Sequence, residues 1–220
     1  KGWIHSFYLV DSSIYDDNQL LNNYKNWYWV KDKFVVLSLS NSTNLLISFG
    51  SLIPCFREEN QFLALLPNNN KVQINDNSLI NFTNAGCRKN ILEYAKQLIG
   101  TTYLWGGKSG FGFDCSGLVQ TVFNTNGISV PRDSRYQYEM VKQSEIKLEQ
   151  AKTGDLLFFE ENDKICHVGI YDKDLKFIHS SGMVKYNSLD EEDELFDKEL
   201  MNKFAGIFSI SEIIKEQLSE

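Results

Sequence analysis

Residues 103–117 form a glycine-rich segment that ends on Phe-Asp-Cys-Ser-Gly. Glycine adopts backbone conformations that other residues avoid, so this segment is typical of a loop. The residues after it place apolar side chains at helical spacing. We therefore predict a loop that carries Cys115 to the first turn of a helix over 115–126, with Gly127 ending that helix.

Two of the three histidines, His167 and His179, lie on separate apolar runs that are typical of strands. The polar segment 172–176 between them predicts a hairpin, which would set the two imidazoles side by side. One imidazole could then take the proton of the Cys115 thiol while the other fixes its tautomer. We expect the helix N-terminus and an imidazole to favour the thiolate. Taken alone, each residue also fits a purely structural role.

The composition is that of a soluble globular protein, since 42% of the 220 residues are hydrophobic and 23% are charged. The net charge of −7 argues against a nucleic-acid partner. No apolar run approaches the roughly 18 residues that a membrane span needs. No signal peptide is visible, although the chain starts at Lys1 and could be a processed form.

The four cysteines show no Cys-x-x-Cys spacing, so neither a structural zinc cage nor a dense disulfide framework is expected. A zinc site built from Cys115, His167 and His179 would lack a fourth ligand of suitable spacing. We therefore expect a thiol-based site with no metal and no other cofactor.

The first part of the chain, residues 1–85, holds short apolar runs separated by Asn, Ser, Pro and Gly. Short strands at this spacing are typical of a small β-barrel. The three asparagines at 68–70 suit a hairpin turn, because asparagine tolerates left-handed backbone angles. The expected strands are 27–30, 33–39, 44–49, 61–66 and 71–74.

The second part, residues 86–220, alternates helix and strand patterns. A helix is expected over 90–99, with a glycine directly after it as the stop signal. A shorter helix, capped by Asp133 or Ser134, is expected to reach about residue 142. The remaining expectations are antiparallel strands at 155–159, 167–171, 177–180 and 204–210, and a surface loop or exposed helix at 190–203.

Five motifs follow one another between residues 90 and 210. They are Thr102–Gly107, Phe113–Val119, Gly154–Phe159, His167–Tyr171 and Phe177–Ser180. Together they resemble the signature of the NlpC/p60 cell-wall cysteine peptidases. The resemblance implies an α+β, papain-like fold with a catalytic triad of Cys115, His167 and His179. It also implies that the Tyr103 hydroxyl helps to build the oxyanion hole, a role that suits a phenol donor.

The segment Pro131–Arg135 resembles a subgroup of this family in which bacterial SH3 domains precede the peptidase. There the residue matching Asp133 pairs with the free amine of an N-terminal L-alanine, and the residue matching Ser134 lines the substrate site. A carboxylate suits an ammonium group, but Asp133 fits the N-cap of the following helix equally well. Further substrate contacts are implied for Ser116, Trp105 and Asp114. The segment Tyr186–Asp190 is also similar to the end of that subgroup.

The opening segment 2–10 resembles the last strands of a bacterial SH3-type domain. We therefore expect residues 1–85 to hold the end of a first barrel and a second barrel, and residues 86–220 to form the peptidase domain. In the subgroup the barrel also contributes tyrosine or acidic groups to the amine pocket. The candidates in this chain are Tyr8, Tyr15, Tyr24, Tyr28 and Glu58.

The resemblance implies a cysteine peptidase that cleaves between γ-D-glutamate and an L-diamino acid, diaminopimelate or lysine, in peptidoglycan stem peptides. We expect a monomer that requires a free N-terminal L-alanine and recycles released wall peptides in the cytoplasm, or acts in the periplasm or outside the cell if a signal peptide was removed. Three alternatives stay open. They are an endopeptidase on intact wall, a wall-binding module without catalysis, and an acyltransferase that passes the thioacyl group to an amine.

Overall fold

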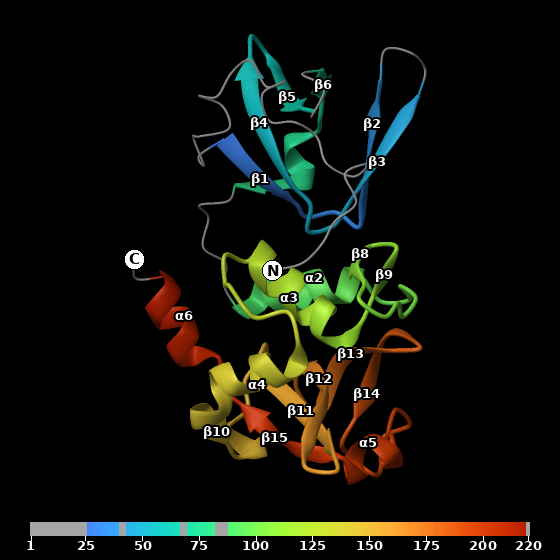
Figure 1. Ribbon diagram of the computed structural model, residues 1–220, viewed down its shortest axis with the longest axis vertical. Helices are drawn as coiled ribbons and strands as arrows, with labels where there is room; N and C mark the ends of the chain where they lie inside the picture. The colour runs from blue at the N-terminus through green and yellow to red at the C-terminus, as the bar shows by residue number, and fades with distance from the viewer. Residues whose placement is uncertain (1–25, 40–42, 67–69, 82–87, 219–220) are drawn as a thin grey trace.

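The computed structural model describes residues 26–39, 43–66, 70–81 and 88–218 (Figure 1). The fold is α+β: an antiparallel β region is followed by a larger part in which helices cover an antiparallel sheet. The expected barrel end at 2–10 and most of the asparagine turn lie outside the described residues.

The described residues of the β region form strands and a short 3-10 turn. They are β1 (Trp27–Val30), β2 (Phe34–Ser38), β3 (Asn44–Ser48), β4 (Leu52–Glu58), β5 (Gln61–Leu65), β6 (Lys71–Gln73), η4 (Asp76–Ser78) and β7 (Leu79–Asn81). Five strands pair in the order β6-β5-β4-β1-β7, and β2 and β3 form a separate hairpin. Antiparallel pairing of β5 with β6 confirms the predicted hairpin.

Two strands of this sheet are absent from the sequence prediction. β4 lies between β1 and β5, in the interior of the sheet, although it contains Pro54. Proline has no N–H to donate, so a strand that contains it is expected at an edge. β7 has only three residues, too few to show an alternating pattern. Both strands therefore form because they pair with neighbouring strands. The local sequence argues against β4 and gives no signal for β7.

The larger part combines six strands of one sheet with helices and short turns. Its helices are α2 (Arg88–Gln97), α3 (Cys115–Thr125), α4 (Ser134–Val141), α5 (Lys198–Asn202) and α6 (Ser211–Leu218), with the 3-10 turns η5 (Lys142–Ser144) and η6 (Leu148–Gln150). Its strands are β8 (Lys108–Ser109), β9 (Gly112–Phe113), β10 (Glu145–Ile146), β11 (Leu156–Glu161), β12 (Lys164–Tyr171), β13 (Lys176–Ser181), β14 (Met183–Ser188) and β15 (Phe204–Phe208). None of the helices in the described part of the chain has the length and apolar character of a transmembrane helix.

The six-stranded sheet is antiparallel, with the order β10-β15-β11-β12-β13-β14. Its central strand β11 is buried on both faces. Leu156 and Phe158 belong to one apolar cluster, and Leu157 and Phe159 belong to the cluster on the opposite face. A strand covered on both sides is expected to be apolar throughout, which explains why the sequence predicts this strand so clearly.

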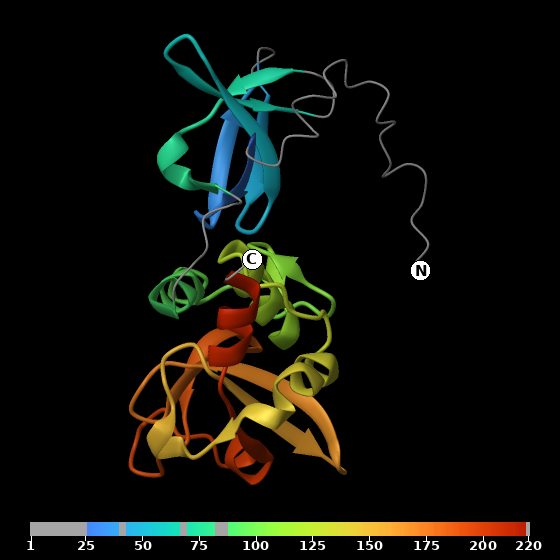
Figure 2. The ribbon, with the colours of Figure 1, turned by 90° about the vertical axis from the view of Figure 1, so that its left-hand side faces the viewer.

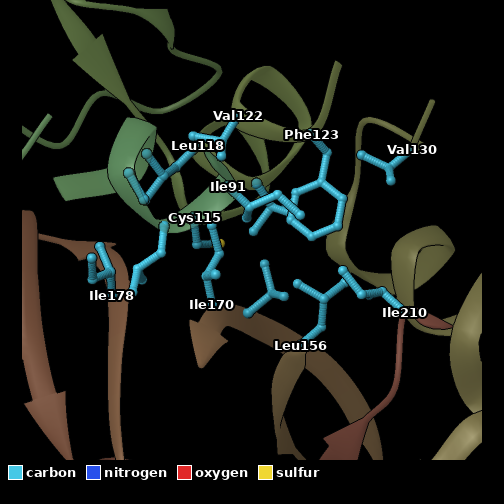
Figure 3. Packing of buried hydrophobic residues seen from close by; sticks show 14 of the residues in the cluster. Ile91, Cys115, Leu118, Val122, Phe123, Val130, Leu156, Ile170, Ile178 and Ile210 are labelled. Atoms are coloured by element: carbon cyan, nitrogen blue, oxygen red, sulfur yellow. The ribbon is translucent and has the colours of Figure 1, made fainter. Parts of the chain in front are cut away.

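Helices α2 and α3 cover one face of this sheet (Figure 3). Ile91 from α2 and Leu118 and Phe123 from α3 belong to the same apolar cluster as Leu156 and Ile170 of the sheet. All five side chains are 0% exposed, so the burial of this helix face fixes α3 against the strands. The first turn of α3 therefore has a fixed position relative to β12.

The helices predicted from the sequence are confirmed with shifted ends. The helix expected over 90–99 spans 88–97, and the chain reverses at Gly100, whose φ is +82°. α3 ends before Gly127, whose φ is +73°, as the stop signal predicts. The charged segment 190–203 contains the short helix α5 within surface turns. β14 is not predicted, and this omission affects the site.

The β region contacts the larger part at α2 and at the loop before α3 (Figures 1 and 2). Phe49 belongs to the same apolar cluster as the buried side chains of α2 and α3, and its ring centroid lies 5.9 Å from that of Tyr94. The Ser48 hydroxyl accepts a hydrogen bond from the backbone N–H of Gly110 at 2.8 Å. The β region therefore supports the glycine-rich loop that leads to Cys115.

Candidate active site

Asp114 fixes the start of α3, whose first residue is Cys115. Its Oδ1 accepts a hydrogen bond from the N–H of Gly117 at 2.6 Å, and its Oδ2 accepts one from the N–H of Gly106 at 2.9 Å. One carboxylate thus caps the helix and holds the preceding loop. An added Cβ at Gly117 would lie 2.1 Å from the carbonyl oxygen of Gly107, so this turn requires glycine.

Arg132 completes the network around Asp114. Its Nη1 lies 2.9 Å from Oδ1 of Asp114, and its Nη2 bonds Oδ2. The same Nη1 donates to the Ser116 hydroxyl at 3.0 Å. Burial acts to raise the pKa of Asp114, but hydrogen bonds from Arg132 and Gly117 outweigh burial and lower that pKa. Asp114 therefore stays ionised, and both of its oxygens are already engaged within the protein.

The Cys115 side chain is 8% exposed and lies against β12. Burial raises the pKa of its thiol, and the charge of Asp114 adds to this effect. Backbone N–H groups of Val168 and Ser116 act in the opposite direction without overcoming burial. The helix N-terminus acts in the expected direction, but desolvation outweighs it and leaves the pKa of the Cys115 thiol raised. A thiol in this state needs a base to become a nucleophile.

Three side chains extend from the cleft into the sheet as a chain of hydrogen bonds. Nε2 of His167 lies 2.7 Å from Nδ1 of His179, and Nε2 of His179 lies 2.8 Å from Oδ1 of Asn187. The Asn187 amide is itself oriented, since its Nδ2 donates to the carbonyl of Leu195 at 2.8 Å. The predicted β12–β13 hairpin and the side-by-side imidazoles are thus confirmed.

This chain determines the tautomer of each neutral ring. The Asn187 Oδ1 can only accept, so Nε2 of His179 carries the proton. Nδ1 of His179 then accepts from Nε2–H of His167, and Nδ1 of His167 is left with a free lone pair. Burial lowers the pKa of His167 to about 3 and that of His179 to about 4, so both rings are neutral at neutral pH. His167 therefore presents an unprotonated Nδ1 that can accept a proton.

Cys115 and His167 line one cleft of about 670 Å³. The other lining residues are Tyr103, Trp105, Gly106, Asp114, Ser116, Arg132, Asp133, Ser134, Arg135, Ile165 and Cys166. Among the described residues, no group of three or more His, Cys, Asp or Glu side chains could hold a metal ion. The arrangement is therefore suited to nucleophilic chemistry by a thiol and an imidazole.

Tyr103 lies on the loop that faces Cys115 across this cleft. Burial raises the pKa of its phenol, and the charge of Asp114 contributes in the same direction. Its hydroxyl is therefore protonated at neutral pH, and it makes no hydrogen bond to another described residue. A free phenol donor at this position can stabilise an oxyanion formed next to Cys115.

Asp133 is the N-cap residue of α4, but its side chain makes no capping hydrogen bond. The carboxylate lies on the cleft and forms no ion pair with another described residue. Gln137 ties α4 to the start of α3, since its Nε2 donates to the carbonyls of Ser116 and Pro131 at 2.9 Å each. Asp133 is thus held near Cys115 without an ion-pair partner among the described residues, although its charge also acts on Arg132.

Comparison with known proteins identifies the larger part of the chain. Residues 100–202 match the family model described as "NlpC/P60 family". Gamma-D-glutamyl-L-lysine dipeptidyl-peptidase of Bacillus subtilis (strain 168) is 33% identical over 159 residues, covering 70% of this chain and 53% of that protein. The chain belongs to the NlpC/P60 family. The motif resemblance found in the sequence is thereby confirmed.

Two further relatives extend the NlpC/P60 comparison. Dipeptidyl-peptidase 6 of Lysinibacillus sphaericus is 36% identical over 126 residues, covering 56% of this chain and 44% of that protein. The crystal structure of an NlpC/P60 family protein from Bacillus cereus ATCC 10987 superimposes with a TM-score of 0.74 at 25% identity, covering 87% of this chain and 65% of that chain. The chain spans about half the length of the curated relatives that it matches.

The structure brings the predicted NlpC/P60 site residues together, but their surroundings differ. Trp105, which is 87% exposed, and Ser134 offer free surface to a substrate. Asp114 and Ser116 also line the cleft, yet their polar atoms are occupied by Arg132. The contacts of Asp114 and Ser116 suit a scaffold for α3 better than direct substrate binding.

No described residue of the β region lines the cleft. Tyr28 packs within the β region, with its ring centroid 5.2 Å from that of Phe62, and Glu58 bonds Lys71 at 2.9 Å. These two candidates for the amine pocket are therefore used elsewhere. The other three candidates, Tyr8, Tyr15 and Tyr24, lie outside the described residues.

Asn187 is the site residue that the sequence reasoning did not assign. It lies on β14, the strand missing from the prediction, opposite Phe177 in the β13–β14 ladder. The signal was present, because residues 186–190 already resemble the end of a known subgroup. Only the strand register shows that this amide reaches His179.

Proposed function

We propose that this protein is a cysteine peptidase that hydrolyses the γ-D-glutamyl to L-diamino acid bond in peptides derived from peptidoglycan. One observation carries the proposal: a buried thiol and a neutral imidazole with a free Nδ1 line the same cleft. Two relatives named for γ-D-glutamyl-L-lysine dipeptidyl-peptidase activity support the substrate class. The carboxylate of Asp133 suits a free amino terminus on that substrate.

Acylation begins with transfer of the Cys115 thiol proton to Nδ1 of His167 as sulfur attacks the γ-carbonyl carbon. The backbone N–H of Cys115 and the Tyr103 hydroxyl stabilise the resulting oxyanion. Collapse breaks the C–N bond, and the proton on His167 passes to the leaving amine. His179 keeps the base oriented throughout, because its Nδ1 accepts the Nε2–H of His167.

Deacylation uses the same groups on water. Nδ1 of His167 takes a proton from a water molecule, whose oxygen attacks the thioester carbon. The C–S bond then breaks, and the proton returns to sulfur. The products are L-alanyl-D-glutamate, with a new γ-carboxylate, and the part of the substrate that begins with the diamino acid.

The test compares L-Ala-γ-D-Glu-L-Lys with its N-acetylated form, in the wild type and in Asp133→Asn. We expect hydrolysis at the γ-glutamyl bond, loss of activity with iodoacetamide and no effect of EDTA. Acetylation should lower kcat/KM for the wild type and should have little further effect in Asp133→Asn. Inhibition by the chelator instead of the alkylating agent would show that the thiol mechanism is wrong.

A second candidate, an endopeptidase on intact wall peptides, is favoured by one observation. Among the described residues, the β region contributes nothing to the cleft, so those residues build no wall around the amino terminus of the substrate. Equal turnover of the acetylated and free peptides, with release of peptides from purified sacculi, would favour this candidate over the first.

A further inference from the structure

Arg135 differs from the other arginines of the chain in its partners. The chain has four arginines. The three others bond carboxylates: Arg57 with Asp76 at 2.8 Å, Arg88 with Asp155 at 2.7 Å, and Arg132 with Asp114. Arg135 forms no ion pair with any described residue. In a chain with 29 acidic and 22 basic residues, an unpaired arginine beside a cleft is available for an outside anion.

The guanidinium of Arg135 is also held in place. It lies over the Tyr136 ring, 4.5 Å from the ring centroid, and its Nη2 donates to the Tyr136 hydroxyl at 3.0 Å. Stacking fixes the plane of the group and leaves most of its five N–H donors unused. A planar, oriented fork of donors matches the two oxygens of a carboxylate.

The charges of the cleft form a specific pattern. Arg132 and Asp114 form an ion pair, which leaves Asp133 and Arg135, two residues apart, as an anion and a cation without an ion-pair partner among the described residues. This pair is complementary to a ligand that carries an ammonium group and a carboxylate close together. An L-alanyl-γ-D-glutamyl group is such a ligand, because the γ-linkage leaves the α-carboxylate of the glutamyl residue free.

We infer that Arg135 binds the α-carboxylate of the γ-linked glutamyl residue, and so selects substrates in which this group is not amidated. The inference rests on the proposed function, and it adds a specificity residue to it. An ordinary α-peptide has no carboxylate at that place, and an isoglutamine residue presents a neutral amide. The guanidinium thus distinguishes three kinds of acyl group that the thiol alone would treat alike.

The experiment measures kcat/KM for three tripeptides in the wild type and in Arg135→Gln. The peptides are L-Ala-γ-D-Glu-L-Lys, its α-carboxamide (isoglutamine) form and its C-terminal amide. We expect α-amidation to lower the wild-type kcat/KM by about 10- to 100-fold, as for loss of a charged hydrogen bond, and to have no effect in Arg135→Gln. C-terminal amidation should change the wild type and the variant alike. Arg57→Gln, which alters an exposed arginine far from the cleft, is the matched control and should behave as the wild type.

Each outcome decides the inference separately from the proposed function. If Arg135→Gln still discriminates against the isoglutamine form, or loses discrimination only against the C-terminal amide, Arg135 does not bind the α-carboxylate. If the wild type hydrolyses the acid and the amide equally, the inference is wrong while the peptidase function stands. If the wild type cleaves none of the three peptides, the proposed function itself fails.

Discussion

The β region and the NlpC/P60 part of this chain are both antiparallel and both carry exposed ion pairs, but among the described residues only the NlpC/P60 part has partly buried ones. In the β region the Arg57–Asp76 and Lys71–Glu58 pairs lie exposed on the surface, where ion pairs contribute little to stability. In the NlpC/P60 part the ion pair of Arg132 is shielded and bonded to a helix cap. The partly buried Arg132–Asp114 pair thus holds the start of the helix that carries Cys115, a role that no described ion pair of the β region has.

This contrast shows what made the sequence prediction succeed or fail. Cys115, His167 and His179 belong to ordered motifs, and the structure brings them together. Tyr28 and Glu58 have only a side-chain type that suits an amine, and both make their contacts inside the β region. The chemical type of a side chain is weak support for a functional site when the residue belongs to no motif of defined spacing.

The largest expected effect separates two buried cysteines, one in each part. Cys115→Ala should lower kcat/KM by at least about 10³-fold, because the nucleophile is removed. Cys55→Ala should leave kcat/KM within about twofold, since Cys55 lies in the β-region core and burial raises the pKa of its thiol to about 12. Assays on L-Ala-γ-D-Glu-L-Lys, with circular dichroism to check folding, would measure both. Turnover by Cys115→Ala would show that Cys115 is not the nucleophile.

The next effect concerns the hydrogen-bond chain behind the cleft. Asn187→Leu should lower kcat by about 10- to 100-fold, because Nε2–H of His179 loses its acceptor and the tautomer of His167 is no longer fixed. Asn187→Asp restores an acceptor and should recover much of that loss. The new carboxylate also stabilises the imidazolium form and raises the imidazole pKa, so the acidic limb of the kcat profile should move to higher pH.

The two Asn187 variants keep the prediction testable if stability also changes. Thermal unfolding of both variants provides the control, since each loses the amide donor to the carbonyl of Leu195. Equal losses of kcat with unshifted pH profiles would show that Asn187 has only a structural role.

The third effect concerns the pH dependence of thiol reactivity. Burial raises the pKa of Cys115 and lowers that of His167, so the neutral pair predominates over the thiolate–imidazolium pair. Alkylation of Cys115 by iodoacetamide, followed by peptide mapping, should therefore keep accelerating above pH 8.5, the ordinary range of a cysteine. On the acidic side, His167 stays unprotonated until the pH falls towards its lowered pKa. A flat alkylation rate between pH 5 and pH 8 would instead indicate a preformed ion pair.

The smallest effect tests how the two parts support each other. Gly50 in the β region has a φ of +75°, and an added Cβ would lie 2.1 Å from Cγ2 of Thr121 on α3. Gly50→Ala should lower the free energy of unfolding by about 2–3 kcal/mol through strain and overpacking. Gly182→Ala is the matched control, because its φ is +70° but nothing lies within 4 Å, and it should cost only about 1 kcal/mol. Equal losses in urea unfolding would mean that the contact with α3 does not matter.

Much of the fold follows from local patterns. Helical spacing with a glycine stop predicts α3, and the continuous apolar run predicts β11, because burial on both faces leaves no polar position. β4 and β14 are not predicted, because Pro54 masks the first and the second has a weak alternation. These strands exist because their neighbours offer unpaired backbone groups.

Local patterns in the sequence are enough to predict a cysteine at a helix start, two histidines on a hairpin, and the family to which their motifs belong. The raised pKa of the Cys115 thiol and the tautomers of the imidazoles follow from the folded arrangement alone. The tertiary structure also decided that Asn187 completes the chain, while Asp133 and Arg135 remain unpaired among the described residues. The reason is physical: burial and strand register set these properties, and both depend on residues distant in the sequence.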